Sequence, residues 1–147
     1  MPGEVRRPPP DQDAVLATLA LAGDRWTFLI LREAFFGVRR FSDLQRILGI
    51  ARTPLSERLG RLVADGVLER VAYQEKPVRH EYRLTELGRD FFPLIVELLR
   101  FGERWLTERP TLRLTHRDCG GQVVSQVRCA RCGEPVDAHG SEPEQLP

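Results

Sequence analysis

Only three cysteines occur in this sequence of 147 residues, and all of them lie between positions 119 and 132. An odd, clustered set argues against a disulfide framework and favours metal or thiol chemistry in a reducing compartment. Long apolar runs are lacking too: the best, residues 26–31, ends at Arg32 and Glu33, short of the roughly 18 residues of a membrane span. The first ten residues lack the apolar segment of a secretory signal. We therefore expect a cytoplasmic protein that does not bind a membrane.

Catalytic signatures are missing as well. The sequence contains no evident Ser/His/Asp arrangement, Walker loop, GxGxxG motif or HExxH motif. We therefore predict that the protein is not an enzyme. Hydrophobic residues nevertheless make up 41% of the chain, which is enough to bury a core and excludes wholesale disorder.

Charge is distributed unevenly along the chain, although the net charge is only +1. Residues 25–83 carry 12 Lys and Arg against 7 Asp and Glu, whereas residues 1–24 and 84–147 each carry a net charge of −2. A basic middle of +5 between acidic flanks is typical of a protein that binds a polyanion. An ordinary mixed surface can show the same excess, so the pattern needs support from the motifs.

The periodicity of the chain predicts one mainly helical α+β domain with a small appendage. Residues 1–11 and 140–147 are expected to be a disordered lead and a disordered tail. Residues 12–107 are expected to form the domain, and residues 110–139 the appendage, with short β-like pieces. The expected elements of the domain are helices at about 12–22, 24–36, 42–48 and 53–64, a β-hairpin within 67–84, and a long helix at 85–106, bent by Pro93. Asp24, Thr85, and Ser42 in a capping box with Gln45 are the predicted helix N-caps.

Two of these helices, joined by residues 49–52, have the lengths and spacing of a helix-turn-helix. Leu55, Leu59 and Leu62 form the expected buried stripe of the second helix, which leaves an open polar face toward a DNA major groove. A plain amphipathic helix would show the same stripe. The predicted DNA contacts on this unit are Arg40, Ser42, Arg52, Thr53, Ser56, Arg58 and Arg61.

The hairpin that follows favours DNA binding over the plainer alternative. Lys76 and Arg79 lie at its predicted tip, where a wing would contact a minor groove or the DNA backbone. Together, the helix-turn-helix, the wing and the basic middle predict a protein that binds double-stranded DNA.

The appendage contains a second motif, in which His116 and Cys119 are followed, after nine intervening residues, by Cys129 and Cys132. One His and three Cys at these spacings predict a closed, tetrahedral structural zinc site, with His139 as an alternative to His116. The other interpretations are a disulfide from Cys119 to Cys129 or Cys132, or three inert buried thiols. Zinc is favoured because so short a segment with few large apolar side chains can hardly fold by packing alone.

Several segments, in one order, carry a resemblance to a known family: GDRWT at 23–27, RFSDL at 40–44, LSERL at 55–59, GVLER at 66–70 and PVRHEYRLT at 77–85. They resemble the HxlR family of bacterial winged helix-turn-helix regulators over about residues 12–106. The resemblance implies a homodimer built on the first and last helices, which binds a palindromic operator and regulates nearby genes. Some members carry a Cys/His tail similar to residues 116–133.

One position departs from the family. Many members have a cysteine thirteen residues before the tryptophan of the GDRWT-like motif, whereas this chain has Asp13 there. Thiol sensing at that position is therefore not available to this protein. The alternative to a DNA-binding regulator is a zinc-dependent protein–protein adaptor that keeps the winged-helix scaffold without binding DNA. The sequence assigns the protein no small-molecule effector.

Overall fold

The computed structural model describes residues 9–144 and residue 146. Its elements, in chain order, are η1 (Pro10–Gln12), α1 (Ala14–Ala22), α2 (Arg25–Phe35), α3 (Phe41–Leu48), α4 (Arg52–Ala64), β1 (Leu68–Glu75), β2 (Val78–Leu84), α5 (Glu86–Arg89) and α6 (Phe92–Trp105). Most of the predicted lead, residues 1–8, lies outside the described residues, and so do positions 145 and 147 of the predicted tail. Residues 10–12, at the boundary between the expected lead and the expected first helix, form a turn of 3-10 helix.

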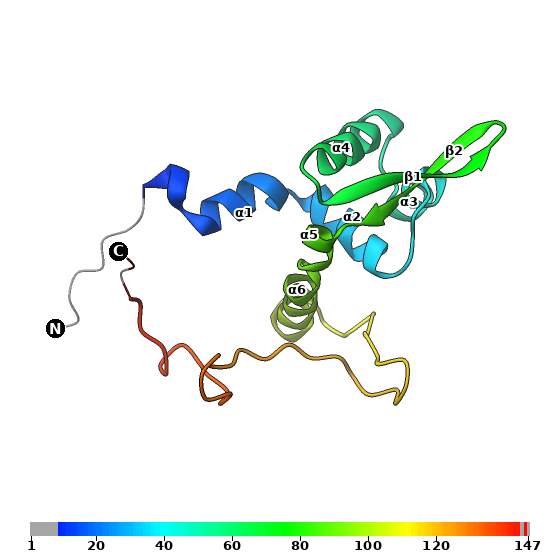
Figure 1. Cartoon of the computed structure of the whole chain (residues 1–147). Helices are drawn as coiled ribbons and strands as arrows, with labels where there is room; N and C mark the ends of the chain where they lie inside the picture. The colour runs from blue at the N-terminus through cyan, green and yellow to red at the C-terminus, as the bar shows by residue number, and fades with distance from the viewer. Residues whose placement is uncertain (1–8, 145, 147) are drawn as a thin grey trace.

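The hydrophobic core lies where α2, α3, α4 and the base of the hairpin meet, with α6 against α2 (Figure 1). The predicted stripe of α4 is confirmed, because Leu55, Leu59 and Leu62 are all buried. They pack with Ile30 and Leu31 of α2 in the same cluster. Burial of this stripe fixes the orientation of α4, and its polar face therefore points away from the core.

Two of the three predicted N-caps are confirmed. The Asp24 carboxylate accepts the Thr27 backbone N–H at 3.0 Å and the Thr27 hydroxyl at 2.7 Å, and the Thr85 hydroxyl accepts the Gly88 N–H at 3.1 Å. The prediction for Ser42 is wrong: α3 begins one residue earlier, at Phe41, with Arg40 as N-cap and no side-chain cap bond. Ser42 thus already lies inside the helix and cannot cap it.

The long last helix expected from the sequence is two helices. Helix α5 ends at Arg89, two residues intervene, and α6 begins at Phe92 with Pro93 in its first turn. In a continuous helix, Pro93 could not donate to the Arg89 carbonyl and its ring would collide with it. The first turn of a new helix has no such requirement, so the chain breaks before the proline.

Strands β1 and β2 form an antiparallel hairpin that projects from the helices of the body (residues 25–105; Figure 1). Its base is attached to the core, because Leu68 is buried and the Thr85 N–H donates to the Val67 carbonyl at 3.1 Å. The register shifts between Ala72 and Gln74, so Tyr73 is an extra residue in β1. A bulge of this kind changes the direction in which nearby side chains point.

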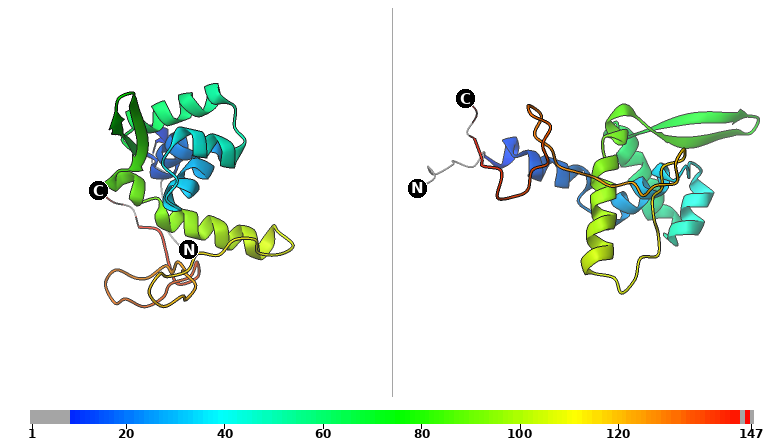
Figure 2. Two further views of the ribbon diagram at one scale, coloured as in Figure 1. Left: turned by 90° about the vertical axis from the view of Figure 1, so that its right-hand side faces the viewer. Right: turned by 90° about the horizontal axis from the view of Figure 1, so that it is seen from below.

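Two segments extend beyond this body on the same side (Figures 1 and 2). One is α1, capped by Asp13, whose carboxylate accepts the N–H groups of Val15 and Leu16. The other is the tail (residues 110–144 and 146), in which isolated bridges between Thr115 and Gln122 and between Arg128 and Pro135 replace the expected β-like pieces. Within the described chain, no single helix has the length and apolarity to cross a membrane. Helices α1 and α2 reach that length and apolarity only when they are counted together, across a 79° bend.

Candidate nucleic-acid interface

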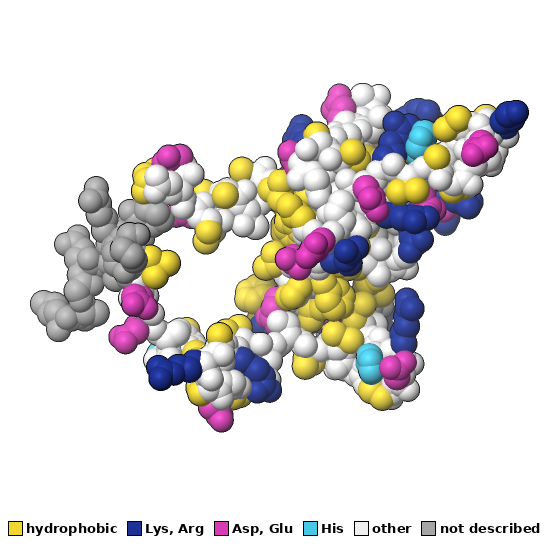
Figure 3. Space-filling model, viewed as in Figure 1, with side chains coloured by type: hydrophobic (Ala, Val, Ile, Leu, Met, Phe, Trp, Pro, Cys, Tyr) yellow, Lys and Arg dark blue, Asp and Glu magenta, His cyan; other side chains and the backbone are white. Residues whose placement is uncertain are grey.

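A groove separates the first turns of α3 and α4 from one face of the hairpin. The residues that line it are Arg40, Phe41, Ser42, Arg52, Ser56, Arg70, Tyr73, Val78, Arg79, His80 and Tyr82. The lining thus contains four arginines and, among the described residues, no acidic side chain. Figure 3 shows Lys and Arg side chains gathered between α4 and the hairpin, and again toward the hairpin tip. The groove is therefore a concentrated positive surface.

Aromatic rings position two of the arginines. The Arg40 guanidinium lies 4.5 Å from the centroid of the Tyr73 ring, and that of Arg52 lies 5.4 Å from the centroid of Phe41. Cation–π contacts of this kind hold a guanidinium in place while its N–H groups stay free to donate. Both arginines also stand where a helix begins, so their charges add to the positive ends of two helix dipoles.

The hairpin contributes groove residues that the sequence prediction missed. Arg70 lies opposite Tyr82 in the sheet register, and His80 lies two residues before Tyr82 on β2, so these three side chains point to the groove face. The strand alternation was a usable signal for Arg70 and Tyr82. No signal in the sequence placed Tyr73, because its side chain joins this face through the bulge.

The one acidic side chain in the middle of β2 is turned away from the groove. Glu81 accepts a hydrogen bond from Arg83 at 2.6 Å and lies 3.9 Å from Arg39. Its charge is thus neutralised by two arginines that do not line the groove. The positive surface between α4 and the hairpin therefore keeps its full charge.

Of the predicted DNA-binding residues, the groove brings together Arg40, Ser42, Arg52, Ser56 and Arg79. Thr53, Arg61 and Lys76 are exposed but do not line it: the first two lie on α4 and Lys76 at the hairpin tip. They are free to touch a ligand wider than the groove itself.

Arg58 is placed differently, because its guanidinium forms an ion pair with Asp24 at the start of α2. Burial acts to raise the pKa of the Asp24 carboxyl, but hydrogen bonds from Thr27 and the positive charge of Arg58 outweigh it. The net result is a pKa below the ordinary value. Arg58 therefore joins α4 to the body, and it does not line the groove.

The tail forms two turns, each containing two of the predicted zinc ligands. In the first knuckle (residues 114–123), His116 Nδ1 lies 3.3 Å from Cys119 Sγ. In the second knuckle (residues 127–136), the N–H groups of Cys132 and Arg131 and the Cys132 thiol bond to the Cys129 sulfur and lower the pKa of the Cys129 thiol. His139 lies outside both knuckles, in a turn held by Asp137.

The structure bears on the rival interpretations of these residues. All three cysteines are free, which contradicts a disulfide, and Cys119 and Cys132 are exposed, which contradicts inert buried thiols. Within the described part of the chain, no group of three or more His, Cys, Asp or Glu is assembled as a metal site. The predicted zinc ligands are therefore present as two pairs.

A helix-turn-helix whose second helix faces a positive groove beside a β-hairpin is the architecture of a winged-helix DNA-binding protein. Residues 21–110 match the HxlR-like helix-turn-helix family, and the chain belongs to that family. As predicted, it is a transcriptional regulator and not an enzyme.

Relatives support this assignment at high coverage. The HTH-type transcriptional regulators Mb3122 of Mycobacterium bovis and Rv3095 of Mycobacterium tuberculosis are each 50% identical over 137 residues, covering 92% of this chain and 87% of theirs. The crystal structure of PA1607, assigned as a transcription factor, is 37% identical with a TM-score of 0.83, covering 92% of this chain and 96% of that one. The oxidized redox regulator HypR covers only 63% of this chain and 96% of its own, at 32% identity and a TM-score of 0.59.

Proposed function

We propose that this protein binds a palindromic operator as a homodimer and regulates the transcription of nearby genes. The observation that carries the proposal is the groove, in which four arginines converge between α4 and the β1–β2 hairpin. In this proposal α4 is the recognition helix and the hairpin is the wing. A zinc-dependent adaptor without DNA binding would have no use for this concentration of unpaired positive charge. The groove therefore favours the DNA-binding regulator.

In this proposal the first turn of α4 enters the major groove. Arg52 and Ser56 lie one helical turn apart on the side of α4 that faces the groove and can donate to base edges. Arg79, with Lys76 at the hairpin tip, contacts the backbone or the minor groove beside it. Arg40 and Arg70, on the walls of the groove, are suited to phosphate oxygens because a guanidinium donates in a planar fork.

The dimer is supported by apolar surface that the body leaves exposed. Leu94, Leu98, Phe101 and Trp105 recur along one face of α6, and each is about half exposed or more. On α1, Val15 is 68% exposed and Leu16 and Leu19 are about half exposed. Several apolar side chains exposed in a row on one helix face are typical of an association surface, and two-fold pairing would cover both helices. Two recognition helices would then lie about 34 Å apart, one turn of DNA.

Binding-site selection from random duplexes, followed by affinity measurements on the selected site, tests the proposal. If Arg52 reads a base, Arg52→Ala costs about 1–3 kcal/mol on the selected site and relaxes specificity at one position in each half-site. If Arg79 holds a phosphate, Arg79→Ala weakens all sequences alike and lowers the salt slope by about 1.

Arg109→Ala is the matched control, since Arg109 is exposed but lies after α6, away from the groove. We expect it to bind as the wild type does. Folded Arg52→Ala and Arg79→Ala variants that also bind as the wild type would contradict the interface. A stoichiometry of one chain per selected site would contradict the homodimer.

A further inference from the structure

The two knuckles are the same structure formed twice, thirteen residues apart. The Gly120 N–H donates to the His116 carbonyl at 2.8 Å, and the Gly133 N–H donates to the Cys129 carbonyl at 2.9 Å. The outer pairs also correspond: Val123 N–H to Leu114 carbonyl at 2.9 Å, and Val136 N–H to Val127 carbonyl at 3.0 Å. His116 thus corresponds to Cys129 and Cys119 to Cys132. Repetition of one hydrogen-bonded turn around four metal-ligating side chains is not expected of an irregular tail.

Each knuckle is built to present two ligands to one ion. Directly after the second ligand, Gly120 and Gly133 have φ values of 71° and 76°, a conformation that favours glycine and closes the turn. In the first knuckle the Gly121 N–H also donates to Cys119 Sγ at 3.4 Å, which suits a thiolate. One His and three Cys match a closed tetrahedral zinc site. Each knuckle supplies half of it.

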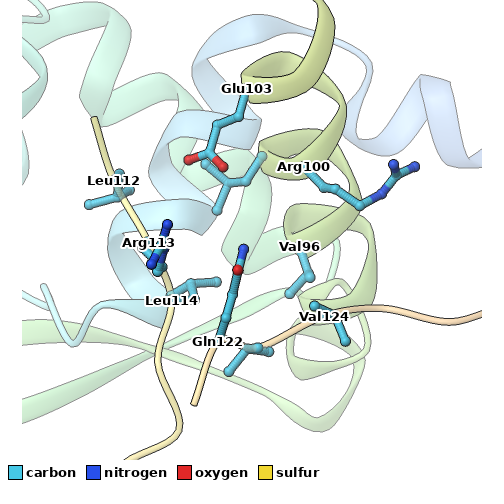
Figure 4. A pocket seen from close by; sticks show the side chains of 10 residues that line it. Val96, Arg100, Glu103, Leu112, Arg113, Leu114, Gln122 and Val124 are labelled. Atoms are coloured by element: carbon cyan, nitrogen blue, oxygen red, sulfur yellow. The ribbon is translucent and has the colours of Figure 1, made fainter. Parts of the chain in front are cut away.

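Among the described residues, the two halves of one chain do not meet in one metal site. The segment that joins the knuckles runs extended across α6, with one knuckle on each side (Figures 1 and 2). Leu114, Gln122 and Val124 line a small pocket against Val96 and Arg100 of α6 (Figure 4). Farther along the same segment, Ser125 and Gln126 line a second pocket together with Glu97 and Arg100 of α6.

We propose that zinc is bound between two copies of this chain, with His116 and Cys119 from one copy and Cys129 and Cys132 from the other. This inference depends on the homodimer proposed above. A two-fold axis close to α6 reverses the direction of the second tail, so the first knuckle of each chain lies beside the second knuckle of the other. The dimer then holds two equivalent zinc ions.

A shared site gives the tail a function that its own packing cannot supply. Metal binding to such a site appears directly as folding free energy of the segments that carry the ligands. Because the ligands come from two chains, the same free energy also holds the dimer together. Removal of zinc therefore releases the tails and weakens the dimer, while the winged-helix bodies stay folded.

Mixed dimers of full-length chains test the proposal. One chain carries His116→Ala and Cys119→Ser, the other carries Cys129→Ser and Cys132→Ser, and each has its own affinity tag. After co-expression and purification on both tags under reducing conditions, elemental analysis gives the zinc content. We expect two zinc ions per wild-type dimer, close to none in either variant homodimer, and one in the mixed dimer, which has one intact shared site. A chelator should raise the dimer dissociation constant of the wild type at least ten-fold and leave that of the variants unchanged.

A mixed dimer without zinc, beside a wild type with two, would show that each chain closes its own site and would overturn the sharing. A wild type without zinc would overturn the metal site. A zinc-loaded monomer in sedimentation would overturn both the sharing and the homodimer. Loss of operator binding in Arg52→Ala is independent of these results, so failure of the DNA proposal is distinguishable from failure of the zinc proposal.

Discussion

The winged-helix body and the tail belong to one chain but are stabilised in opposite ways. Apart from Ala22 at the end of α1, the buried side chains, among them Leu31, Leu55 and Leu59, belong to the body, whereas no described residue of the tail is buried. The body is therefore held by removal of apolar surface from water. The tail is held by short-range hydrogen bonds and by its contact with α6. Such a segment buries too little apolar surface to offset its chain entropy easily, which is why we propose that a shared zinc ion orders it.

The largest expected difference between the two regions is their response to loss of an apolar side chain. Leu59 is fully buried, so Leu59→Ala should lower the free energy of unfolding by about 2–5 kcal/mol. Leu146, 76% exposed, undergoes the same chemical change in Leu146→Ala and should alter it by less than about 0.5 kcal/mol. Denaturant unfolding at fixed protein concentration measures both. Equal losses would refute the division into a packed body and an unpacked tail.

Two glycines sharpen the comparison. A methyl group at Gly88 would overlap the Val67 carbonyl oxygen, so Gly88→Ala should lower the free energy of unfolding of the body by about 1–3 kcal/mol. Gly133 has open space around it but a φ of 76°, so Gly133→Ala should cost about 1–2 kcal/mol in the tail alone. That cost should be measured as weaker zinc affinity in a chelator competition, with body unfolding unchanged. A Gly133→Ala protein with a destabilised body would show that the two regions fold as one.

A pair of aspartates gives a smaller effect that depends on pH. Asp24→Ala removes the cap of α2 and the partner of Arg58, and should lower the free energy of unfolding by about 0.5–2 kcal/mol at neutral pH. Because the folded-state pKa of Asp24 lies below its unfolded value, this contribution is complete above about pH 4 and disappears as the pH falls further. Asp137 caps a tail turn by accepting the His139 and Gly140 N–H groups. Asp137→Ala should leave the free energy of unfolding of the body unchanged at every pH. A difference in stability between the wild type and Asp24→Ala that grows as the pH falls would contradict the role given to Asp24.

The smallest expected effect is a gain in stability. Gly60 lies exposed in α4, and within the described structure no atom would approach a methyl group there to 4 Å. Gly60→Ala should therefore raise the free energy of unfolding by about 0.5–1 kcal/mol through helix propensity. The tail contains no helix within its described residues, so none of its glycines offers the same gain. Lower stability in the Gly60→Ala variant would mean that α4 packs differently.

Local signals predicted much of the fold. The Asp24 and Thr85 caps and the apolar stripe of α4 depend on residues within one or two turns of each other. Two local predictions failed, the single last helix and the Ser42 cap. Pro93 ended one helix and began another, and the start of α3 at Phe41 moved Ser42 inside the helix.

The sequence by itself determined the winged helix-turn-helix, its basic middle and the Cys/His motif of the tail, because each depends on spacing along the chain. Only the tertiary structure decided which charges face the groove. Arg58 turned to Asp24, and Arg70 and Tyr73 joined Arg40 and Arg52, because burial of the leucine stripe fixed the rotation of α4 and the hairpin register fixed the strand faces. The tertiary structure also decided that the two knuckles form separately. Their spacing in sequence is compatible with one site, but the segment between them lies extended across α6 and keeps the two pairs of ligands apart.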